Sequence, residues 1–260
     1  MDINNFIIDR ILRGVALSQK DDSVLFSINQ IQNASLNCAS ESTDAVDALG
    51  TPIATFFRSK SAEFSAENAL FDMNLMATQL GTSKKVATST NKITVPAMET
   101  FTVPAGANPK YELKHTPVTP PAEIYALNGD STFGTKYTKD SAASTTNFSI
   151  ADKTITIPSG VTAGTDMFVM YEYVTDKAVE VVNSATEFPV GCKFVMEVLG
   201  CDVCDQTTLI HAYVIFNNFK LSPDFDWSIA TDSTHPFSGK AQQDYCDKEK
   251  RLFSIVISEE

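Results

Sequence analysis

The residues best suited to chemistry are two cysteines in the stretch GCDVCDQTT, where two residues separate Cys201 from Cys204. Two thiolates at this spacing can bind a zinc ion or form a redox-active disulfide. A structural zinc ion needs two more ligands, for which Cys192, Cys246 and His211 are the candidates. No second Cys-x-x-Cys follows, and the motif lies between two expected strands, whereas a thioredoxin-type site opens a helix. We therefore interpret Cys201 and Cys204 as loop cysteines and keep a small zinc-binding or redox protein as an alternative.

The three histidines do not form a recognisable catalytic or metal-binding pattern. His211 begins a strongly apolar run, which favours a hydrogen-bonded structural role, and His115 has no ligand partner nearby in the sequence. His235 precedes a proline in what reads as a turn, which predicts a surface position. A Ser222–His235–Asp224 arrangement can be drawn, but there is no Gly-x-Ser-x-Gly motif and no glycine-rich phosphate loop. The sequence predicts no enzyme activity, no cofactor and no metal ion.

Composition and charge exclude several classes of protein. The 260 residues are 43% hydrophobic, which is typical of one large or two modest soluble domains. Twenty Lys and Arg stand against 32 Asp and Glu, a net charge of -12, which argues against gripping nucleic-acid phosphates or an anionic membrane. The first residues, MDINNFIIDRILR, do not resemble a signal peptide, and no apolar run is long enough for a membrane anchor. We therefore expect the chain to be made in a cytoplasm. The odd count of five cysteines does not indicate a disulfide framework.

Alternating and apolar segments separated by polar turns predict a mainly β protein. An Asp152–Lys153 turn between two of these segments predicts a hairpin. The expected strands are residues 24–28, 34–38, 53–57, 93–95, 100–103, 111–113, 123–127, 148–150, 154–157, 167–174, 194–199, 210–216 and 252–257.

One helix is expected at about residues 65–80, SAENALFDMNLMATQL. Ser65 fits an N-cap, and Leu70, Met73, Ala77 and Leu80 recur at helical spacing. A glycine follows as a C-terminal stop. We expect this helix to lie against a sheet.

Two segments in the middle of the chain read as exposed loops. Residues 104–121 are rich in proline, and residues 128–147 are rich in Gly, Ser, Thr and Lys. The expected organisation is therefore a β core made of residues 1–91 and 183–260, into which an elaborated, loop-rich and Ig-like β section, residues 92–182, is inserted.

Two stretches resemble the major tail proteins, or tail tube proteins, of tailed bacteriophages. They are residues 50–80, GTPIATFFRSKSAEFSAENALFDMNLMATQL, and residues 214–238, VIFNNFKLSPDFDWSIATDSTHPFS, with a strand returning through 224–229 and a final strand at 252–257. The resemblance implies a tail-tube-like β-sandwich or split barrel with one flanking helix. It further implies a homo-oligomer of stacked rings, usually hexamers, in the virion tail, contacts with other tail proteins, and a lumen through which DNA is ejected without specific binding.

The residues suit such an assembly in two respects. Strand edges, normally protected, can pair between neighbouring copies so that their sheets join around the lumen. Residues 1–22 and the polar span 39–51, which carries few apolar side chains, are expected to be arms that become ordered on assembly. The resemblance also implies a negatively charged lumen, which the acidity of the chain would supply.

Three other classes remain open on the sequence alone. A capsid decoration protein or another virion surface β-module would share the β-rich composition and use residues 92–182 as its binding face. A zinc or redox protein would use Cys201 and Cys204. A periplasmic or cell-wall β-domain lacks the export signal it would need and is the weakest of the three.

Overall fold

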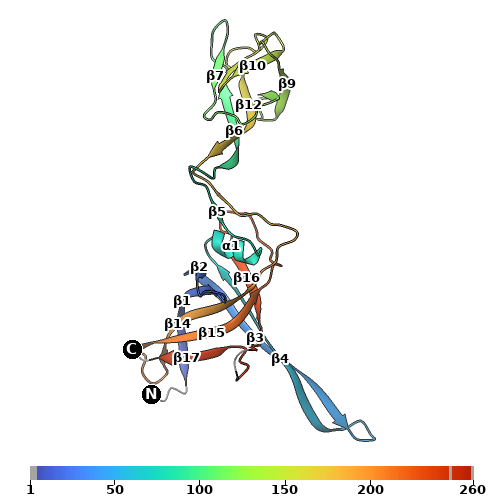
Figure 1. Ribbon diagram of the computed structural model, residues 1–260, viewed down its shortest axis with the longest axis vertical. Coiled ribbons are helices and arrows are strands. Elements are labelled where there is room, and N and C mark those ends of the chain that lie inside the picture. Colours follow the sequence, from blue (N-terminus) through green and yellow to red (C-terminus); the bar gives the residue numbers. More distant parts are fainter. Residues whose placement is uncertain (1–4, 246–247, 259–260) are drawn as a thin grey trace. The chain divides into compact units, whose positions relative to one another are not determined.

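The computed structural model describes residues 5–245 and 248–258, and it divides into two compact units. Unit 1 consists of Met1–Lys84 and Val181–Glu260, and unit 2 consists of Lys85–Glu180. Each unit has an apolar core of its own. Strands dominate both units, and a single helix is present among the described residues, which confirms a mainly β fold of the split-barrel type with one helix (Figure 1).

Unit 1 is built on one curled sheet in the order β2-β1-β14-β15-β16-β4-β3, in which all pairs are antiparallel. The long strand β15 pairs with β16 through its C-terminal end and with β17 through its N-terminal half. The strands are β1 (Phe6–Ser18), β2 (Val24–Ile28), β3 (Ile31–Val46), β4 (Pro52–Asn68), β14 (Gly191–Asp202), β15 (Leu209–Leu221), β16 (His235–Ala241) and β17 (Ser254–Ser258).

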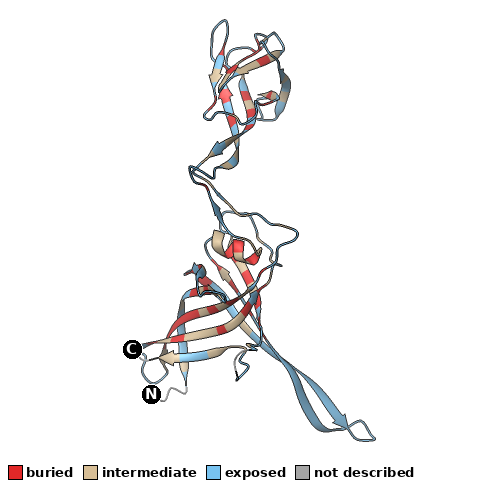
Figure 2. Ribbon diagram, in the orientation of Figure 1, coloured by how far each residue is buried: buried red, intermediate tan, exposed pale blue. Residues whose placement is uncertain are grey.

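The core of unit 1 is a cluster of phenylalanine rings packed on the inner face of this curled sheet. Figure 2 shows in red the buried parts of the strands. Because strand side chains alternate between faces, every second residue from Ala62 to Ala66 of β4 and from Cys192 to Val198 of β14 belongs to this core. Phe64 lies 5.7 Å from Phe194 and 5.8 Å from Phe216 between ring centroids, and the other members are Phe26, Phe219 and Phe237. Gly14 of β1 allows this packing, since a Cβ there would stand 2.8 Å from Ile31 Cδ1.

The expected helix is much shorter than the sequence indicated. The helix α1 covers Met73–Gln79 only, and Asp72 is its N-cap, because its carboxylate accepts hydrogen bonds from two backbone N–H groups of the first turn. Ser65 lies in β4, so the predicted start was wrong, and Leu70 is exposed before the helix begins. The predicted stop was correct: Gly81 has φ +72°, which a residue without a Cβ adopts at low cost.

Both expected arms contain strands. Residues 6–18 form β1, which pairs with β14 along its length, so an arm over residues 1–22 was wrong for them. Residues 1–4 lie outside the described part. Residues 39–46 belong to β3 and pair with β4, so the second segment is a hairpin and not an irregular loop. Ser59 has φ +53° at a register shift inside the continuous strand β4.

Unit 2 contains a seven-stranded sheet in the order β6-β12-β8-β9-β10-β11-β7 and a short ribbon of β5 with β13. Asp152 has φ +55° and turns β10 into β11, as the sequence predicted. The strands are β5 (Lys85–Val86), β6 (Ile93–Thr102), β7 (Lys110–Glu112), β8 (Glu123–Leu127), β9 (Phe133–Lys139), β10 (Asn147–Ala151), β11 (Thr154–Thr156), β12 (Asp166–Thr175) and β13 (Val179–Glu180).

Three further expectations were wrong in detail. Residues 133–139, expected in a loop, form β9. Residues 93–95 and 100–103 were expected as two strands, but residues 93–102 form one, β6. Its Pro96 is accommodated because β6 is at the edge of its sheet. Residues 224–229 form no strand; the strand that returns beside β4 is β16, further along the chain.

A buried carboxylate organises the interior of unit 2. Glu99 accepts hydrogen bonds from the hydroxyl groups of Tyr111 and Tyr171 and from the backbone N–H of Lys114. Burial by itself raises the pKa of Glu99, but these hydrogen bonds outweigh it and hold the pKa below its ordinary value. Burial and the Glu99 carboxylate raise the pKa of both tyrosines to about 12. This network links β6, β7 and β12 and serves the packing of unit 2.

Candidate interaction surfaces

The Cys201–Cys204 motif lies where β14 passes into β15. Cys201 and Leu209 form the last residue pair between β14 and β15. Cys204 is exposed in the loop that follows. Cys192 stands nine residues before Cys201 on the same extended strand, about 30 Å away at the rise of a β-strand, so it cannot complete a zinc site with it. Cys246 lies outside the described residues. Across residues 5–245 and 248–258, no three His, Cys, Asp or Glu side chains gather as metal ligands.

Cys192 has a different environment from the loop cysteines. It is fully buried, and its thiol donates to the Phe219 carbonyl oxygen at 3.3 Å. Burial raises the pKa of this thiol to about 12, so it remains protonated and unreactive at neutral pH.

His211 and Arg13 both bond to Glu197 on the open face of the unit 1 sheet, opposite the phenylalanine core. Its Nδ1 lies 2.9 Å from Glu197 Oε1, and Glu197 also accepts a hydrogen bond from Arg13. Burial by itself raises the pKa of Glu197, but the hydrogen bonds from Arg13 and His211 hold that pKa below its ordinary value. The structural role expected for His211 is confirmed, and the carboxylate compensates the positive charge of Arg13.

His235 is fully buried at the start of β16, so its predicted surface position was wrong. Its Nδ1 accepts a hydrogen bond from the backbone N–H of Asp72 at 3.3 Å, which leaves Nε2 to donate to Gln79 Oε1 at 2.8 Å. Gln79 in turn donates to the Pro236 carbonyl oxygen, and Phe71 stacks on the imidazole ring. The neutral ring therefore ties both ends of α1 to β16, a contact between distant segments that the local sequence does not reveal.

Acidification is expected to lower the stability that His235 gives to the contact between α1 and β16. Burial lowers the pKa of His235, although the Asp72 carboxylate opposes the effect, so the folded protein binds this proton less well than the unfolded chain. The stability from neutral His235 is present above the unfolded pKa of about 6.5 and is lost as pH falls below it, by at most about 1.4 kcal/mol per pH unit. Urea denaturation followed by Trp227 fluorescence at pH 7, 6 and 5 measures this loss.

Two variants separate His235 from other titrating groups. His235→Gln should be less stable than the wild type at pH 7 but nearly independent of pH between 7 and 5. His115→Gln, which changes an exposed histidine of unit 2, should keep the wild-type dependence. An unchanged pH dependence in His235→Gln would assign the effect to another group.

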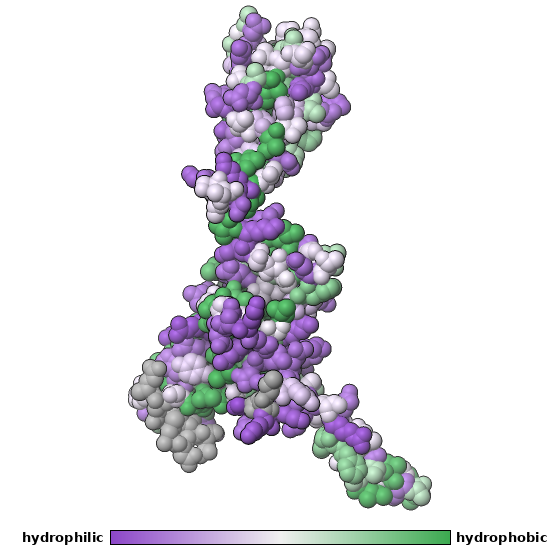
Figure 3. Space-filling view, viewed as in Figure 1, coloured by the Kyte–Doolittle hydropathy of each residue, from purple (hydrophilic) through white to green (hydrophobic). Residues whose placement is uncertain are grey.

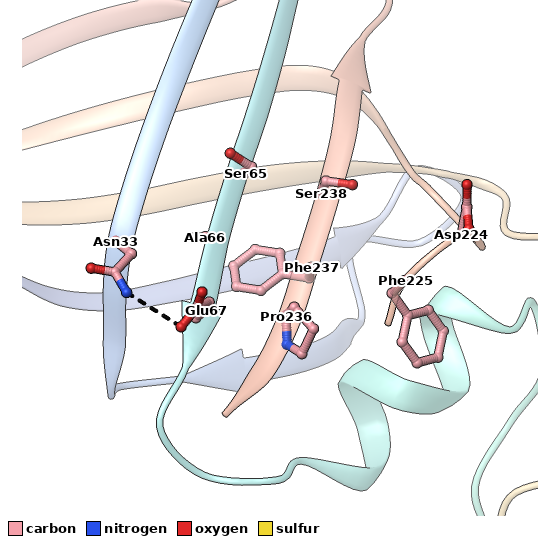
Figure 4. Close-up of a pocket in the computed structure, with 9 residues that line it drawn as sticks. All are labelled: Asn33, Ser65, Ala66, Glu67, Asp224, Phe225, Pro236, Phe237 and Ser238. Atoms are coloured by element: carbon pink, nitrogen blue, oxygen red, sulfur yellow. Dashed lines mark hydrogen bonds between the residues drawn. The ribbon is translucent and has the colours of Figure 1, made fainter. Parts of the chain in front are cut away.

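The imagined Ser222–His235–Asp224 site does not form. Asp224 lines a hollow of about 200 Å³ on the outer face of β4 and β16, together with Ser65, Phe225 and Ser238 (Figure 4). His235 lies on the opposite face of β16, among its α1 partners, and Ser222 Oγ accepts from the backbone N–H of Asp224 instead. Among the described residues, neither the Ser65 nor the Ser238 hydroxyl in this hollow is hydrogen-bonded to a carboxylate or a histidine.

Two open strand edges lie on the same half of the unit 1 sheet. β2 pairs with β1 only from Gly14 to Leu17, so residues 6–13 of β1 have no described strand on that side. At the other end, residues 254–257 pair with β15 alone among the described strands. Exposed apolar side chains stand on both edges, Ile7 and Ile8 on β1 and Ile255 and Val256 on β17. Such edges are normally short, charged or covered, because an open edge can pair with another chain.

The second exposed apolar feature is the outer part of the β3–β4 hairpin, residues 39–61, which we call the hairpin arm. Every residue of the hairpin arm is exposed, and its outer end is apolar (Figures 2 and 3). At about 3.3 Å per residue, the ten exposed residues of β4 that follow the turn extend about 30 Å beyond the last buried position. The exposed apolar side chains at this end are Val46, Leu49, Ile53, Phe56 and Phe57.

Negative charge is concentrated in unit 1. This unit contains 12 Lys and Arg and 22 Asp and Glu, whereas unit 2 contains 8 and 10. Unit 1 therefore accounts for a net charge of -10 of the total of -12. Among the described helices, none is long and apolar enough to cross a membrane.

The comparison with known proteins places the chain in a family. No curated protein matches it. The model of the YomU/Tube protein family matches residues 6–255, which include unit 2, most of unit 1 and the hairpin arm. This chain belongs to the YomU/Tube family of phage tail-tube-like proteins.

Proposed function

We propose that this protein is the tail tube subunit of a phage virion, made in the host cytoplasm, with a structural and not a catalytic role. In this proposal, copies join edge to edge into rings, the rings stack, and the resulting tube is the channel for DNA ejection. The observation that carries it is the pair of open edges on the four-stranded segment β1-β14-β15-β17.

The strand directions suit head-to-tail addition of identical copies. β1, β14, β15 and β17 alternate in direction, so β17 of one copy and β1 of the next run antiparallel when the copies are related by a rotation. The same contact then repeats from copy to copy, as in a closed ring with a heterologous interface. Two register shifts in β1 curve this part of the sheet, as bulges do where sheets close into barrels.

The two faces of the joined sheet differ, and this difference indicates which face lines the channel. One face is covered by the phenylalanine core and by the strands packed on it, so in this proposal it points to the outside of the ring. The open face then lines the channel. Its Arg13 is compensated by Glu197, and unit 1 is acidic as a whole, so we expect this wall not to bind the phosphates of passing DNA tightly.

Electron microscopy of the concentrated, purified protein tests the proposal. We expect negatively stained rings and hollow tubes with a stain-filled centre. Particles that remain single copies at every concentration, including after addition of tails isolated from virions as seeds, would contradict it. Hexameric symmetry, which the resemblance implies, can be counted in end-on views of the rings.

A further inference from the structure

Three aromatic side chains form a row on the outer face of the unit 2 sheet. Phe133 of β9 lies beside Tyr125 of β8 and Phe168 of β12, with ring centroids 5.1 and 5.0 Å away. Phe168 and Tyr125 are paired across their strands, and none of the three belongs to the core of unit 2. Phe133 is 60% exposed, and the other two rings are partly exposed. Because large aromatic side chains are usually buried, this exposed row indicates a binding surface.

The carboxylate of Glu123 stands next to one end of the aromatic row and is held in place. Glu123 lies two residues before Tyr125, on the same face of β8. It accepts hydrogen bonds from the Tyr125 hydroxyl group and, at 2.9 Å, from Lys136 Nζ. These hydrogen bonds hold the pKa of Glu123 below its ordinary value, so the group is ionised at neutral pH.

A second carboxylate, that of Asp166, stands next to the Phe168 ring. Asp166 lies two residues before Phe168, on the same face of β12, and accepts a hydrogen bond from the Thr102 hydroxyl group at 2.6 Å. An ionised carboxylate has about four acceptor positions, so Asp166 and Glu123 can each accept further hydrogen bonds from a ligand. The aromatic row is thus flanked by two fixed hydrogen-bond acceptors.

The spacing and tilt of the three rings suit a chain of sugars. The centroid distances of 5.0 and 5.1 Å are comparable to the size of one pyranose ring. The Phe133 ring is tilted by 39° from Tyr125 and by 49° from Phe168, so the row is stepped and not flat. A pyranose ring has apolar C–H faces, which stack on aromatic rings, and hydroxyl groups around its edge, which donate to carboxylates. The surface therefore matches a glycan whose successive rings are turned relative to one another.

We propose that the aromatic row binds a glycan, whose pyranose rings stack on Tyr125, Phe133 and Phe168 while its hydroxyl groups donate to Glu123 and Asp166. This site goes beyond the proposed function and does not depend on it, because it lies within unit 2 of a single copy. In an assembly, many equivalent sites would bind together, and weak single contacts would add up to firm attachment to a surface that carries the glycan.

A second copy of unit 2 and an apolar protein face suit this surface less well. Copies in the proposed ring are related by rotation, so the face of one copy does not meet the same face of its neighbour. An apolar protein face would remove water from Glu123 and Asp166 without replacing the hydrogen bonds, which is costly. A glycan combines apolar faces with hydroxyl donors in each of its units, and it satisfies the rings and the carboxylates together.

Titration of the full chain with short glycans, at a protein concentration below that of assembly, tests the site. The probes are cellohexaose, chitohexaose and maltohexaose, and the methionine methyl groups of the protein are isotopically labelled for NMR. Met98 and Met170 are exposed and paired with each other, and Met170 follows Phe168 by two residues on the same face. We expect at least one probe to shift both signals saturably, while the signal of Met76, buried in unit 1, is unchanged.

Three variants assign the binding to the aromatic row. Phe133→Ser should weaken binding about tenfold, the size expected for the loss of one stacked ring. Glu123→Gln should weaken it about fivefold, because a charge-assisted hydrogen bond becomes a neutral one. Neither substitution should lower the unfolding transition of unit 2 measured by calorimetry. Phe57→Ser, the matched control, removes a 70% exposed phenylalanine of the hairpin arm and should bind as the wild type does.

Three results would overturn the glycan site. The first is the absence of any shift with all three probes at millimolar concentration. The second is binding of equal strength in the wild type and Phe133→Ser, which would place the ligand elsewhere. The third is a shift of Met98 and Met170 with protein concentration in the absence of sugar, which would show that a second copy covers this face. None of these results bears on ring assembly, which electron microscopy of the same protein tests separately.

Discussion

Ile8→Lys protein and Ile255→Lys protein are each expected to remain single folded copies under conditions in which the wild type assembles. Ile8 stands on the open edge of β1 and Ile255 on the open edge of β17, and both are exposed in the isolated copy. A lysine on either edge would be buried without a partner when strands from two copies pair, which costs several kcal/mol per contact. Since each contact uses one edge of each kind, either substitution blocks every contact in a uniform population.

A mixture of the Ile8→Lys and Ile255→Lys proteins is expected to form dimers although neither variant assembles alone. Ile8→Lys copies keep a normal β17 edge, and Ile255→Lys copies keep a normal β1 edge, so one intact contact can form between unlike copies. We expect heterodimers and no larger species, measured by native mass spectrometry with one variant isotopically labelled.

A control substitution outside the two edges tests whether the added charge alone prevents assembly. Val118→Lys introduces the same charge at an exposed position of unit 2 and should assemble normally. Homodimers of either variant would indicate that like edges pair with each other, which gives closed dimers and no ring. Normal tubes from Ile255→Lys alone would remove β17 from the interface.

Phe194→Ala is expected to destabilise unit 1 by about 3–5 kcal/mol, the cost of removing a fully buried phenylalanine. The Phe194 ring contacts five others, with centroid distances from 5.5 to 6.2 Å, so the cavity is surrounded by rigid side chains that cannot close it. Since ordinary domains are stable by only 5–15 kcal/mol, this loss is a large share of the total. Denaturation followed by Trp227, the only tryptophan of the chain, reports on unit 1.

Phe148→Ala provides the matched control in the other core. Phe148 is also fully buried, but it packs within unit 2, which has no tryptophan. The two cores share no member, so we expect Phe148→Ala to leave the Trp227 transition in place while it lowers a separate transition seen by calorimetry. A Trp227 transition shifted equally by both variants would mean that the two units unfold as one.

Part of β4 and the whole of β1 were not recognised from the sequence because strand pairing between distant segments defines them. In residues 62–68, buried and exposed side chains alternate, which is a strand pattern, but good helix formers follow directly and extended the expected helix backwards to Ser65. Residues 6–18 were not expected as a strand, because β1 is specified by pairing with β14, about 190 residues away. Local propensity does not contain such pairings.

By itself the sequence determined the mainly β class, the turn at Asp152 and Lys153, the glycine that ends α1, the excess of negative charge, and a resemblance to tail tube proteins that the family match bears out. These are properties of local pattern and composition. Only the tertiary structure decided that His235 is buried, that residues 39–61 form a paired arm with aromatic rings on opposite faces, and that β1 and β17 end the same four-stranded segment with open edges. Each of these depends on which distant strands pair and in what register, and a one-residue change of register would reverse every face, so no local pattern can specify them.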